Sequence, residues 1–172
     1  DEIVVRLRQE PLTGDEIKKH SKAGRVPILK IEEDARSTTV WDSLAICETL
    51  AERHPEAKLW PDDAFVRAEA RSYAAEMHSG FPDLRDQLSM DFARRKPLPP
   101  LRDETKAQIA RILDSWTSAL TRFASEGDFL FGSLSVADCM YAPVVSRFVT
   151  YGVEVPHSVK LYMEKVMALA TA

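Results

Sequence analysis

Cysteine is scarce in this sequence and carries no recognisable pattern. Cys47 and Cys139 are the only two among 172 residues, and no Cys-x-x-Cys spacing occurs, so neither a disulfide framework nor a cysteine-ligated zinc site is expected. The four histidines are dispersed without metal-ligand spacing, and we expect no metal. Both cysteines fall within helical patterns, where burial as small apolar residues is expected. A disulfide and a catalytic thiol are the less favoured alternatives.

Excess charge of one sign and long apolar runs are also missing. The 23 basic and 27 acidic residues give a net charge of −4, which provides no basic face for nucleic acid. No apolar run approaches the ~20 residues that cross a bilayer, and no signal-peptide pattern opens the chain. We therefore expect no nucleic-acid partner, no membrane association and a cytoplasmic location. The absence of a Gly-x-Gly-x-x-Gly motif or phosphate loop gives no sign of nucleotide binding.

Strand patterns are confined to the first third of the chain. Alternating and β-branched residues predict strands over 2–8, 26–31 and 37–41. A short helix is expected over 15–21. The segment Ser43–Arg53 has one apolar face, which predicts an amphipathic helix capped by Ser43.

Helical patterns fill the remainder. The segment 55–62 holds two prolines without periodicity, which is typical of a linker. It separates a first domain, 1–54, from a second, 63–172. Within the second domain we expect helices over 62–81, 84–95, 103–125, 135–150 and 156–169. The fold class is therefore an α+β domain followed by an all-α domain.

Two short motifs in the first domain could hold a peptide-like anion. If the Val26–Pro27 peptide bond is cis, the N–H and C=O of Val26 point outward and can pair with a ligand backbone. Asp42 and Ser43 stand where a strand gives way to a helix. A helix start presents unpaired N–H groups and the positive end of the helix dipole, which suits a carboxylate.

This pair of motifs resembles the glutathione site of the cytosolic glutathione S-transferases, with a bacterial-type subgroup left open. The resemblance implies a thioredoxin-like N-terminal domain, an all-helical C-terminal domain and glutathione as co-substrate. It implies that Val26 and Pro27 form the turn that binds the cysteinyl backbone, and that Asp42 and Ser43 bind the γ-glutamyl end. Arg25 could pair with the glycyl carboxylate. Many relatives carry Glu or Gln where Asp42 stands.

The resemblance is incomplete at the front of the chain. The family fold begins strand–helix–strand, whereas this chain begins at the second strand, so the N-terminal domain is expected to lack its first strand and helix. A three-stranded sheet with an exposed edge is prone to aggregate, and we expect the polypeptide to start earlier. In the family, a Tyr, Ser or Cys near the first helix activates the thiol. That residue would precede Asp1, so the catalytic residue is unknown.

Two motifs of the helical region add candidates. Met77, His78 and Phe81 could line an apolar co-substrate pocket, or they could pack against the long helix or a dimer partner. Ser135 and Asp138 form a helix-start capping box that resembles one in the same family and is expected to stabilise the fold. Further cleft candidates, for which packing is the favoured alternative, are Tyr141, Arg147 and Tyr151.

The function implied by the resemblance is a glutathione transferase. Its glutathione thiolate would attack a small, largely apolar electrophile, in a detoxifying homodimer. A glutathione-dependent isomerase, a dehalogenase and a non-catalytic binding or scaffold protein are alternatives on the same fold. Fold alone does not choose among them.

Overall fold

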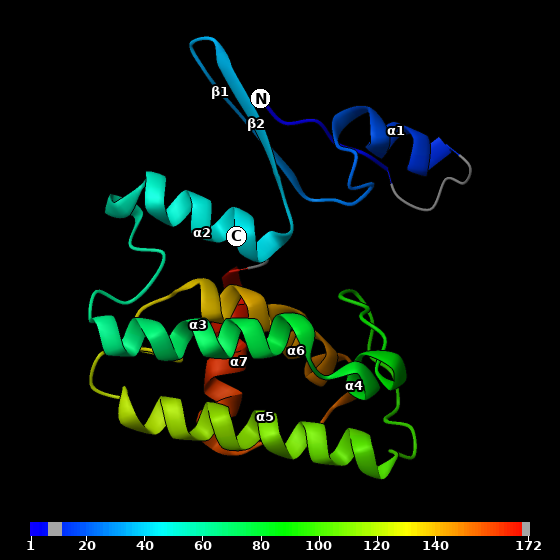
Figure 1. Cartoon of the computed structure of the whole chain (residues 1–172). Helices are drawn as coiled ribbons and strands as arrows, with labels where there is room; N and C mark the ends of the chain where they lie inside the picture. The colour runs from blue at the N-terminus through cyan, green and yellow to red at the C-terminus, as the bar shows by residue number, and fades with distance from the viewer. Residues whose placement is uncertain (7–11, 170–172) are drawn as a thin grey trace. The chain divides into compact units, whose positions relative to one another are not determined.

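The computed structural model describes residues 1–6 and 12–169 of the chain. They form two compact units, which divide between Ala57 and Lys58 (Figure 1). This division falls inside the segment 55–62 that the sequence predicts as a linker. The first unit combines strands with helices and the second is helical. The predicted fold class is confirmed.

The first unit is built around a β-hairpin. Its elements are helix α1 (Leu12–His20), strands β1 (Ile28–Glu33) and β2 (Arg36–Trp41), helix α2 (Ser43–Arg53) and the 3-10 turn η1 (Pro55–Ala57). The two strands pair antiparallel, from Ile28 opposite Trp41 to Glu33 opposite Arg36. Helix α2 follows β2 directly and packs against it. The helix predicted from the apolar spacing of Ser43–Arg53 is confirmed with both of its bounds.

The strand predicted over residues 2–8 is wrong where it can be compared. Residues 2–6 form no strand, and residues 7 and 8 lie outside the described part of the chain. Within the described residues the sheet therefore has two strands and not three. An apolar β-branched run becomes a strand only where a neighbour supplies ladder hydrogen bonds. Here Ile3 and Val4 are 68% and 77% exposed.

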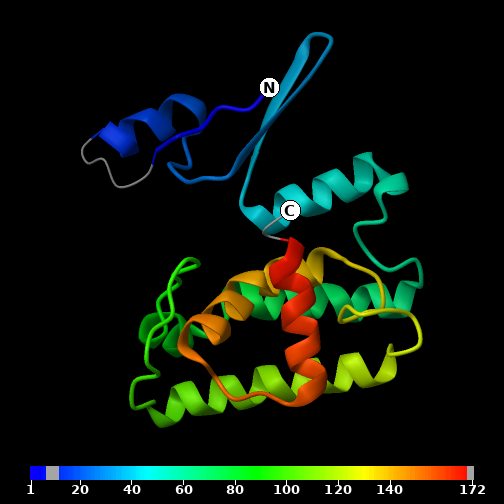
Figure 2. The same cartoon turned by 180° about the vertical axis from the view of Figure 1, so that it is seen from behind.

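The second unit is a bundle of helices. Its elements are α3 (Ala64–Ser79), α4 (Pro82–Gln87), α5 (Asp103–Arg122), α6 (Val136–Tyr151) and α7 (His157–Leu169). Helix α6 packs against α3 and α7, and α5 packs against α4 and α7 (Figure 2). Helices α3 and α5 are further joined by two ion pairs, Glu69–Arg122 at 2.7 Å and Glu76–Arg111 at 2.9 Å.

The helix predicted over 84–95 ends early, at Gln87. Side chains of α6 take carbonyl oxygens that a longer helix would need. Arg147 donates to the carbonyl of Leu88 at 2.8 Å, and Thr150 donates to that of Asp91 at 2.7 Å. Tertiary hydrogen bonds thus replace helical ones after α4.

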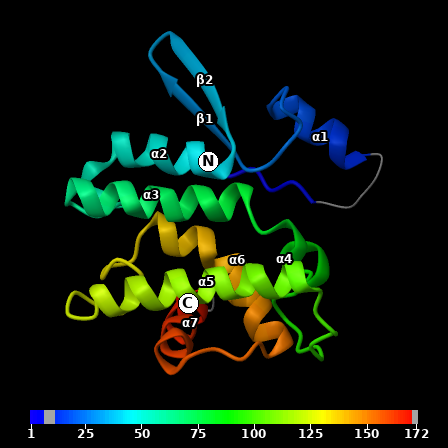
Figure 3. The same ribbon diagram turned by 60° about the horizontal axis from the view of Figure 1, so that its bottom comes forward.

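The core of the helical unit is an aromatic cluster centred on Trp116, which is fully buried. Its ring meets those of Tyr141 and Tyr162 edge to face at 5.3 Å each, and that of Phe148 at 5.7 Å. Figure 3 shows α5, α6 and α7, the helices that carry these rings. Edge-to-face contacts of this kind add to the stabilisation from burial.

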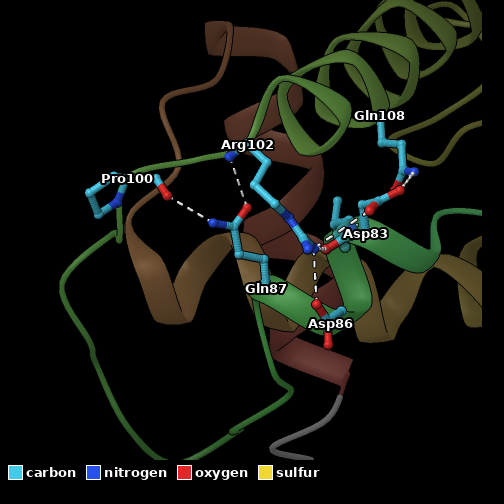
Figure 4. A network of polar contacts seen from close by, with 7 residues as sticks. Asp83, Asp86, Gln87, Pro100, Arg102 and Gln108 are labelled. Atoms are coloured by element: carbon cyan, nitrogen blue, oxygen red, sulfur yellow. Dashed lines mark hydrogen bonds and ion pairs between the residues drawn. The ribbon is translucent and has the colours of Figure 1, made fainter.

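A polar network joins α4 to the start of α5 (Figure 4). The guanidinium of Arg102 binds Asp86 at 2.9 Å and Asp83 at 3.5 Å. The amide of Gln108 donates to Asp83 Oδ2 at 2.8 Å and accepts from the N–H of Leu84 at 2.9 Å. Because the first N–H groups of a helix have no partner within it, Gln108 caps α4 from another helix.

Removing this cap should destabilise the fold. Gln108→Ala leaves the N–H of the fully buried Leu84 without its acceptor, and we expect the free energy of unfolding to fall by about 1–3 kcal/mol. Lys106→Ala, which removes only an exposed ion pair with Asp103, should cost less than about 1 kcal/mol. Denaturant unfolding of both variants measures the difference. Equal stability of the two would contradict this role of Gln108.

Candidate functional site

The two motifs singled out in the first domain meet at one end of the hairpin. Ile28 and Trp41 form the terminal pair of the ladder. Pro27 precedes Ile28 and Asp42 follows Trp41, so both lie just beyond this pair. In an antiparallel hairpin, residues directly opposite each other are about 5 Å apart at Cα. The register therefore makes the Val26–Pro27 turn and the start of α2 neighbours (Figure 1).

The Val26–Pro27 peptide bond is cis, the condition on which the sequence argument depended. Val26 lies before the first ladder residue, Ile28, and within the described residues its backbone N–H and C=O have no hydrogen-bond partner. Its side chain is 42% exposed, and Arg25 and Pro27 are exposed as well. The backbone of this turn can therefore pair with a ligand.

Asp42, and not Ser43, caps helix α2, so the cap predicted from the sequence is wrong. Asp42 has non-helical backbone angles, φ 77° and ψ 128°. Its Oδ1 accepts from the N–H groups of Leu44 at 3.0 Å and Ala45 at 3.5 Å. The physical reason is that the residue outside the first turn directs its side chain back onto the helix N–H groups. Ser43 is already the first helical residue.

This cap changes the chemistry of the site. The Asp42 carboxylate occupies two of the N–H groups that an anion would otherwise use, and it adds a negative charge. An ammonium group of a ligand would be attracted to that charge. The amide and hydroxyl of Ser43 remain as nearby hydrogen-bonding groups. The site can thus receive the amine and the carboxylate of an amino-acid end.

The pocket candidates of the helical unit are largely buried. Met77 and Phe81 are 5% and 7% exposed, and His78 is half-buried. The Arg85 side chain donates to the carbonyls of Met77 and His78, the latter at 3.1 Å. This burial is compatible with the packing alternative, and the assignment of the three residues to a substrate pocket stays a prediction. Among the further cleft candidates, Tyr141 and Tyr151 are buried and Arg147 is half-buried.

The capping box of Ser135 and Asp138 is present at the start of α6. Asp138 is 1% exposed and accepts from the N–H of Ser135 at 2.9 Å and its hydroxyl at 3.1 Å. Its second oxygen accepts from the N–H of Leu130 at 3.0 Å. Burial raises the pKa of Asp138 above its ordinary value, although these hydrogen bonds favour the ionised form. Through the bond to Leu130, the capping box therefore also holds the loop that precedes α6.

Cys47 does not have the features of an activated thiol. Cys47 is half-buried, and burial together with the charge of Glu48 raises its pKa, whereas a nucleophilic cysteine needs a lowered one. The expectation that Cys139 is buried is wrong, because it lies on the exposed side of α6, opposite Tyr141 and its buried neighbours. Within the described residues, neither cysteine forms a disulfide.

No group of three or more His, Cys, Asp or Glu side chains in the described part of the chain could hold a metal ion. Among the helices formed by residues 1–6 and 12–169, none has the length and apolar character needed to cross a membrane.

Comparison with known proteins matches both units to one family. Residues 1–53 match the model "Glutathione S-transferase, N-terminal domain", and residues 99–165 match "Glutathione S-transferase, C-terminal domain". A curated relative, glutathione S-transferase omega-1 of Rattus norvegicus, is 28% identical over 124 residues. That alignment covers 72% of this chain and 47% of the relative. The chain thus spans about half the length of this curated relative.

Solved structures give the same result. Maleylacetoacetate isomerase from Anaeromyxobacter dehalogenans 2CP-1 is 30% identical, with a TM-score of 0.60 over 91% of this chain and 74% of that protein. A second structure of that isomerase contains dicarboxyethyl glutathione and citrate in its active site. A glutathione transferase homologue from Burkholderia gl BGR1, solved with bound glutathione, is 26% identical, with a TM-score of 0.62 over 89% and 72% of the two chains.

The N-terminal match includes the cis turn and the start of α2, and the C-terminal match includes the capping box of α6. Sequence, fold and local geometry therefore agree, and the chain belongs to the glutathione S-transferase family.

Proposed function

We propose that the chain binds glutathione at the open end of the β1–β2 hairpin. We further propose that the thiolate of this glutathione attacks a small, largely apolar electrophile. The observation that carries this proposal is the shared position of the Val26–Pro27 turn and Asp42 beyond the Ile28–Trp41 pair. Relatives whose structures contain glutathione or a glutathione adduct support the choice of ligand.

Each part of the tripeptide has a partner in this proposal. The backbone of Val26 pairs with the cysteinyl residue as a short added strand. Asp42 meets the γ-glutamyl ammonium, and Ser43 binds the adjoining carboxylate. Arg25 is exposed beside the turn and pairs with the glycyl carboxylate. Pro27 fixes the direction of the chain so that the backbone N–H and C=O of Val26 face the ligand.

The reaction joins the glutathione sulfur to an electrophilic carbon. The thiolate is the nucleophile, and a free thiol has a pKa of about 8.5, so the protein must favour the ionised form. The sulfur–carbon bond forms as the leaving group departs with its electron pair, or as a proton is added at the neighbouring carbon. Met77, His78 and Phe81 are the proposed lining for the apolar part of the electrophile.

Isomerisation is the second candidate, because the maleylacetoacetate isomerase is 30% identical to this chain. In a glutathione-dependent isomerase the thiolate adds to a double bond and leaves again after rotation. Glutathione is then regenerated, whereas conjugation consumes it. Both reactions need the same glutathione site and differ in the fate of the sulfur.

Thermal unfolding with glutathione tests the binding proposal. A ligand at a hundredfold its dissociation constant should stabilise the protein by about 2.7 kcal/mol. S-methylglutathione should stabilise it similarly, because the proposed contacts hold the peptide and not the thiol. The dipeptide Cys-Gly, which lacks the γ-glutamyl group, should give a much smaller shift. The absence of any shift with glutathione would refute the proposal.

Measuring the concentration of free glutathione thiol during the reaction distinguishes conjugation from isomerisation. With a chlorinated nitrobenzene, a transferase lowers the thiol concentration by one equivalent per product. With a maleyl-substituted keto acid, an isomerase changes the absorbance of the substrate while the thiol concentration stays constant. Glutathione binding without either reaction would favour the non-catalytic alternative. The detoxifying role, the homodimer and the cytoplasmic location stay predictions, and sedimentation of the purified chain would measure its oligomeric state.

A further inference from the structure

The segment that joins α4 to α5 is rich in proline. Residues 94–100 read Arg-Arg-Lys-Pro-Leu-Pro-Pro and form neither helix nor strand. The proline ring fixes φ at about −65°, and a residue that precedes a proline is restricted to extended backbone angles. At least one of these limits applies to each residue from Lys96 to Pro100, and together they favour a polyproline II helix. Arg102, two residues further on, has φ −66° and ψ 155°, which is close to that conformation.

Hydrogen bonds to the helical unit hold this segment near both of its ends. The N–H of Lys96 donates to the carbonyl of Thr150 at 2.8 Å. At the other end, the Gln87 side chain makes two contacts (Figure 4). Its Nε2 donates to the carbonyl of Pro100 at 2.8 Å, and its Oε1 accepts from the N–H of Arg102 at 3.1 Å. The segment is therefore fixed in place without belonging to a helix or a sheet.

The exposure of the segment follows a three-residue repeat. A polyproline II helix has about three residues per turn, so residues three apart share an edge. Lys96 and Pro99 are half-buried, whereas Arg94, Pro97 and Pro100 are exposed. Pro97 and Pro100 thus share one accessible edge, and Arg94 precedes Pro97 at the same spacing. The pattern on this side of the segment is Arg-x-x-Pro-x-x-Pro.

The charge of Arg94 is available to a partner. Its side chain is 76% exposed, and its Nε lies 3.6 Å from Asp91, whose carboxylate is closer to Lys96 at 3.0 Å. An exposed ion pair of this kind contributes little to stability. The reverse spacing, Pro-x-x-Pro-x-Arg, ends at Arg102, but the Arg102 guanidinium is held by Asp86 at 2.9 Å. Arg94 is therefore the better candidate to face an acidic partner.

We propose that residues 94–100 are a docking site for a protein domain of the SH3 type, which has an aromatic-lined groove with acidic residues at its rim. Aromatic side chains of such a groove pack against the paired prolines of a polyproline II helix, here Pro97 and Pro100. Arg94 pairs with a carboxylate at the rim. The carbonyls of Pro97 and Leu98 accept no hydrogen bond within the described residues, so they can accept from the partner. Because the segment is already fixed, binding loses little conformational entropy.

A membrane surface is the alternative occupant. Met90, Phe92 and Leu98 are 55%, 43% and 42% exposed, and apolar side chains beside arginines are typical of contact with anionic lipid. Lipid binding needs no fixed spacing between prolines, whereas a groove does. The shared edge of Pro97 and Pro100 therefore favours the protein domain.

Titration of the wild-type chain into an isotope-labelled SH3 domain that binds Arg-x-x-Pro-x-x-Pro peptides tests the site. The amide signals that shift should be those of the groove, and a proline-rich peptide that occupies the groove should displace the chain. The same domain with its groove tryptophan replaced by alanine should show no shifts. These measurements depend on neither the glutathione site nor the folding of a variant.

Variants of exposed residues assign the contacts. Pro97→Ala and Pro100→Ala should each weaken binding about tenfold, and Arg94→Gln about fivefold. Arg95→Gln, which makes the same change in charge off this edge, and Pro156→Ala, an exposed proline before α7, should stay within about twofold of the wild type. Unchanged unfolding temperatures show that each variant is folded.

Three results would overturn the inference. The first is the absence of groove shifts with the wild-type chain. The second is wild-type affinity in both Pro97→Ala and Pro100→Ala. The third is sedimentation of the chain with vesicles of equal parts phosphatidylcholine and phosphatidylserine without binding to the SH3 domain, which would assign the segment to a membrane surface.

Discussion

Asp42→Asn should weaken glutathione binding about ten- to a hundredfold, which is about 1.4–2.7 kcal/mol. The Asp42 carboxylate caps α2 through Oδ1. The asparagine side chain has the same length and carries an acceptor oxygen at the same position. Asparagine is as good an N-cap as aspartate, and it tolerates the positive φ of 77° at this position. The variant therefore removes the charge that meets the γ-glutamyl ammonium and keeps the helix start.

The matched control is Asp63→Asn. Asp63 caps α3 in the same way, accepting from the N–H groups of Phe65 and Val66 at 2.9 Å each. We expect both variants to keep the wild-type unfolding temperature within a few degrees, and only Asp42→Asn to lose glutathione affinity, as measured by isothermal titration. Wild-type affinity in Asp42→Asn would remove Asp42 from the proposed site.

Asp138→Ala should destabilise the protein by about 3–5 kcal/mol. It would leave the buried N–H groups of Leu130 and Ser135 without an acceptor, and each unsatisfied buried donor costs about 1–3 kcal/mol. The Ser135 hydroxyl would lose its partner as well. Denaturant unfolding measures the change. Asp63→Ala, an exposed cap, should cost only about 1 kcal/mol, and a similar loss in both variants would contradict the special role of Asp138.

The pH dependence provides a second measurement at the same residue. Burial raises the folded-state pKa of Asp138 above its ordinary value of 3.8, so the folded protein binds the proton more tightly than the unfolded chain. The contribution of this group is fully present below the ordinary pKa and is lost as pH rises through the raised one. In D138N this decline should be absent. A parallel pH dependence of the two proteins would contradict the raised pKa.

Local patterns predicted the helices better than the strands. The apolar spacing of Ser43–Arg53 gave both bounds of α2, because an amphipathic helix forms its hydrogen bonds within its own segment. The strand predicted over 2–8 was wrong over residues 2–6, and the helix predicted over 84–95 ended early. Both outcomes depend on residues that are distant in sequence. A strand needs a second strand, and the residues after α4 give their carbonyls to Arg147 and Thr150.

The candidate site divides in the same way. The residue types at Val26–Pro27 and Asp42–Ser43 were enough to predict a site for a peptide-like anion, and the resemblance to the glutathione S-transferases implied that this ligand is glutathione. The pattern could not decide which residue caps α2, since serine and aspartate are both good caps. The pattern assigned no partner to Arg85, whose side chain donates to the carbonyls of Met77 and His78. A segment interrupted by proline does not predict where a long side chain finds its partners.

By itself, the sequence determined that an α+β part is followed by a helical part, and its motifs resembled those of the family to which the chain belongs. The division into these two parts depends on short-range periodicity, which the sequence carries within each segment. Only the tertiary structure decided that Pro27 and Asp42 share one end of the hairpin, and that Asp138 is buried and bonded to the N–H of Leu130. It also decided that the carbonyls of Leu88 and Asp91 accept from Arg147 and Thr150. The reason is that strand register, burial and charge pairing depend on residues that are distant in sequence and become neighbours only in the fold.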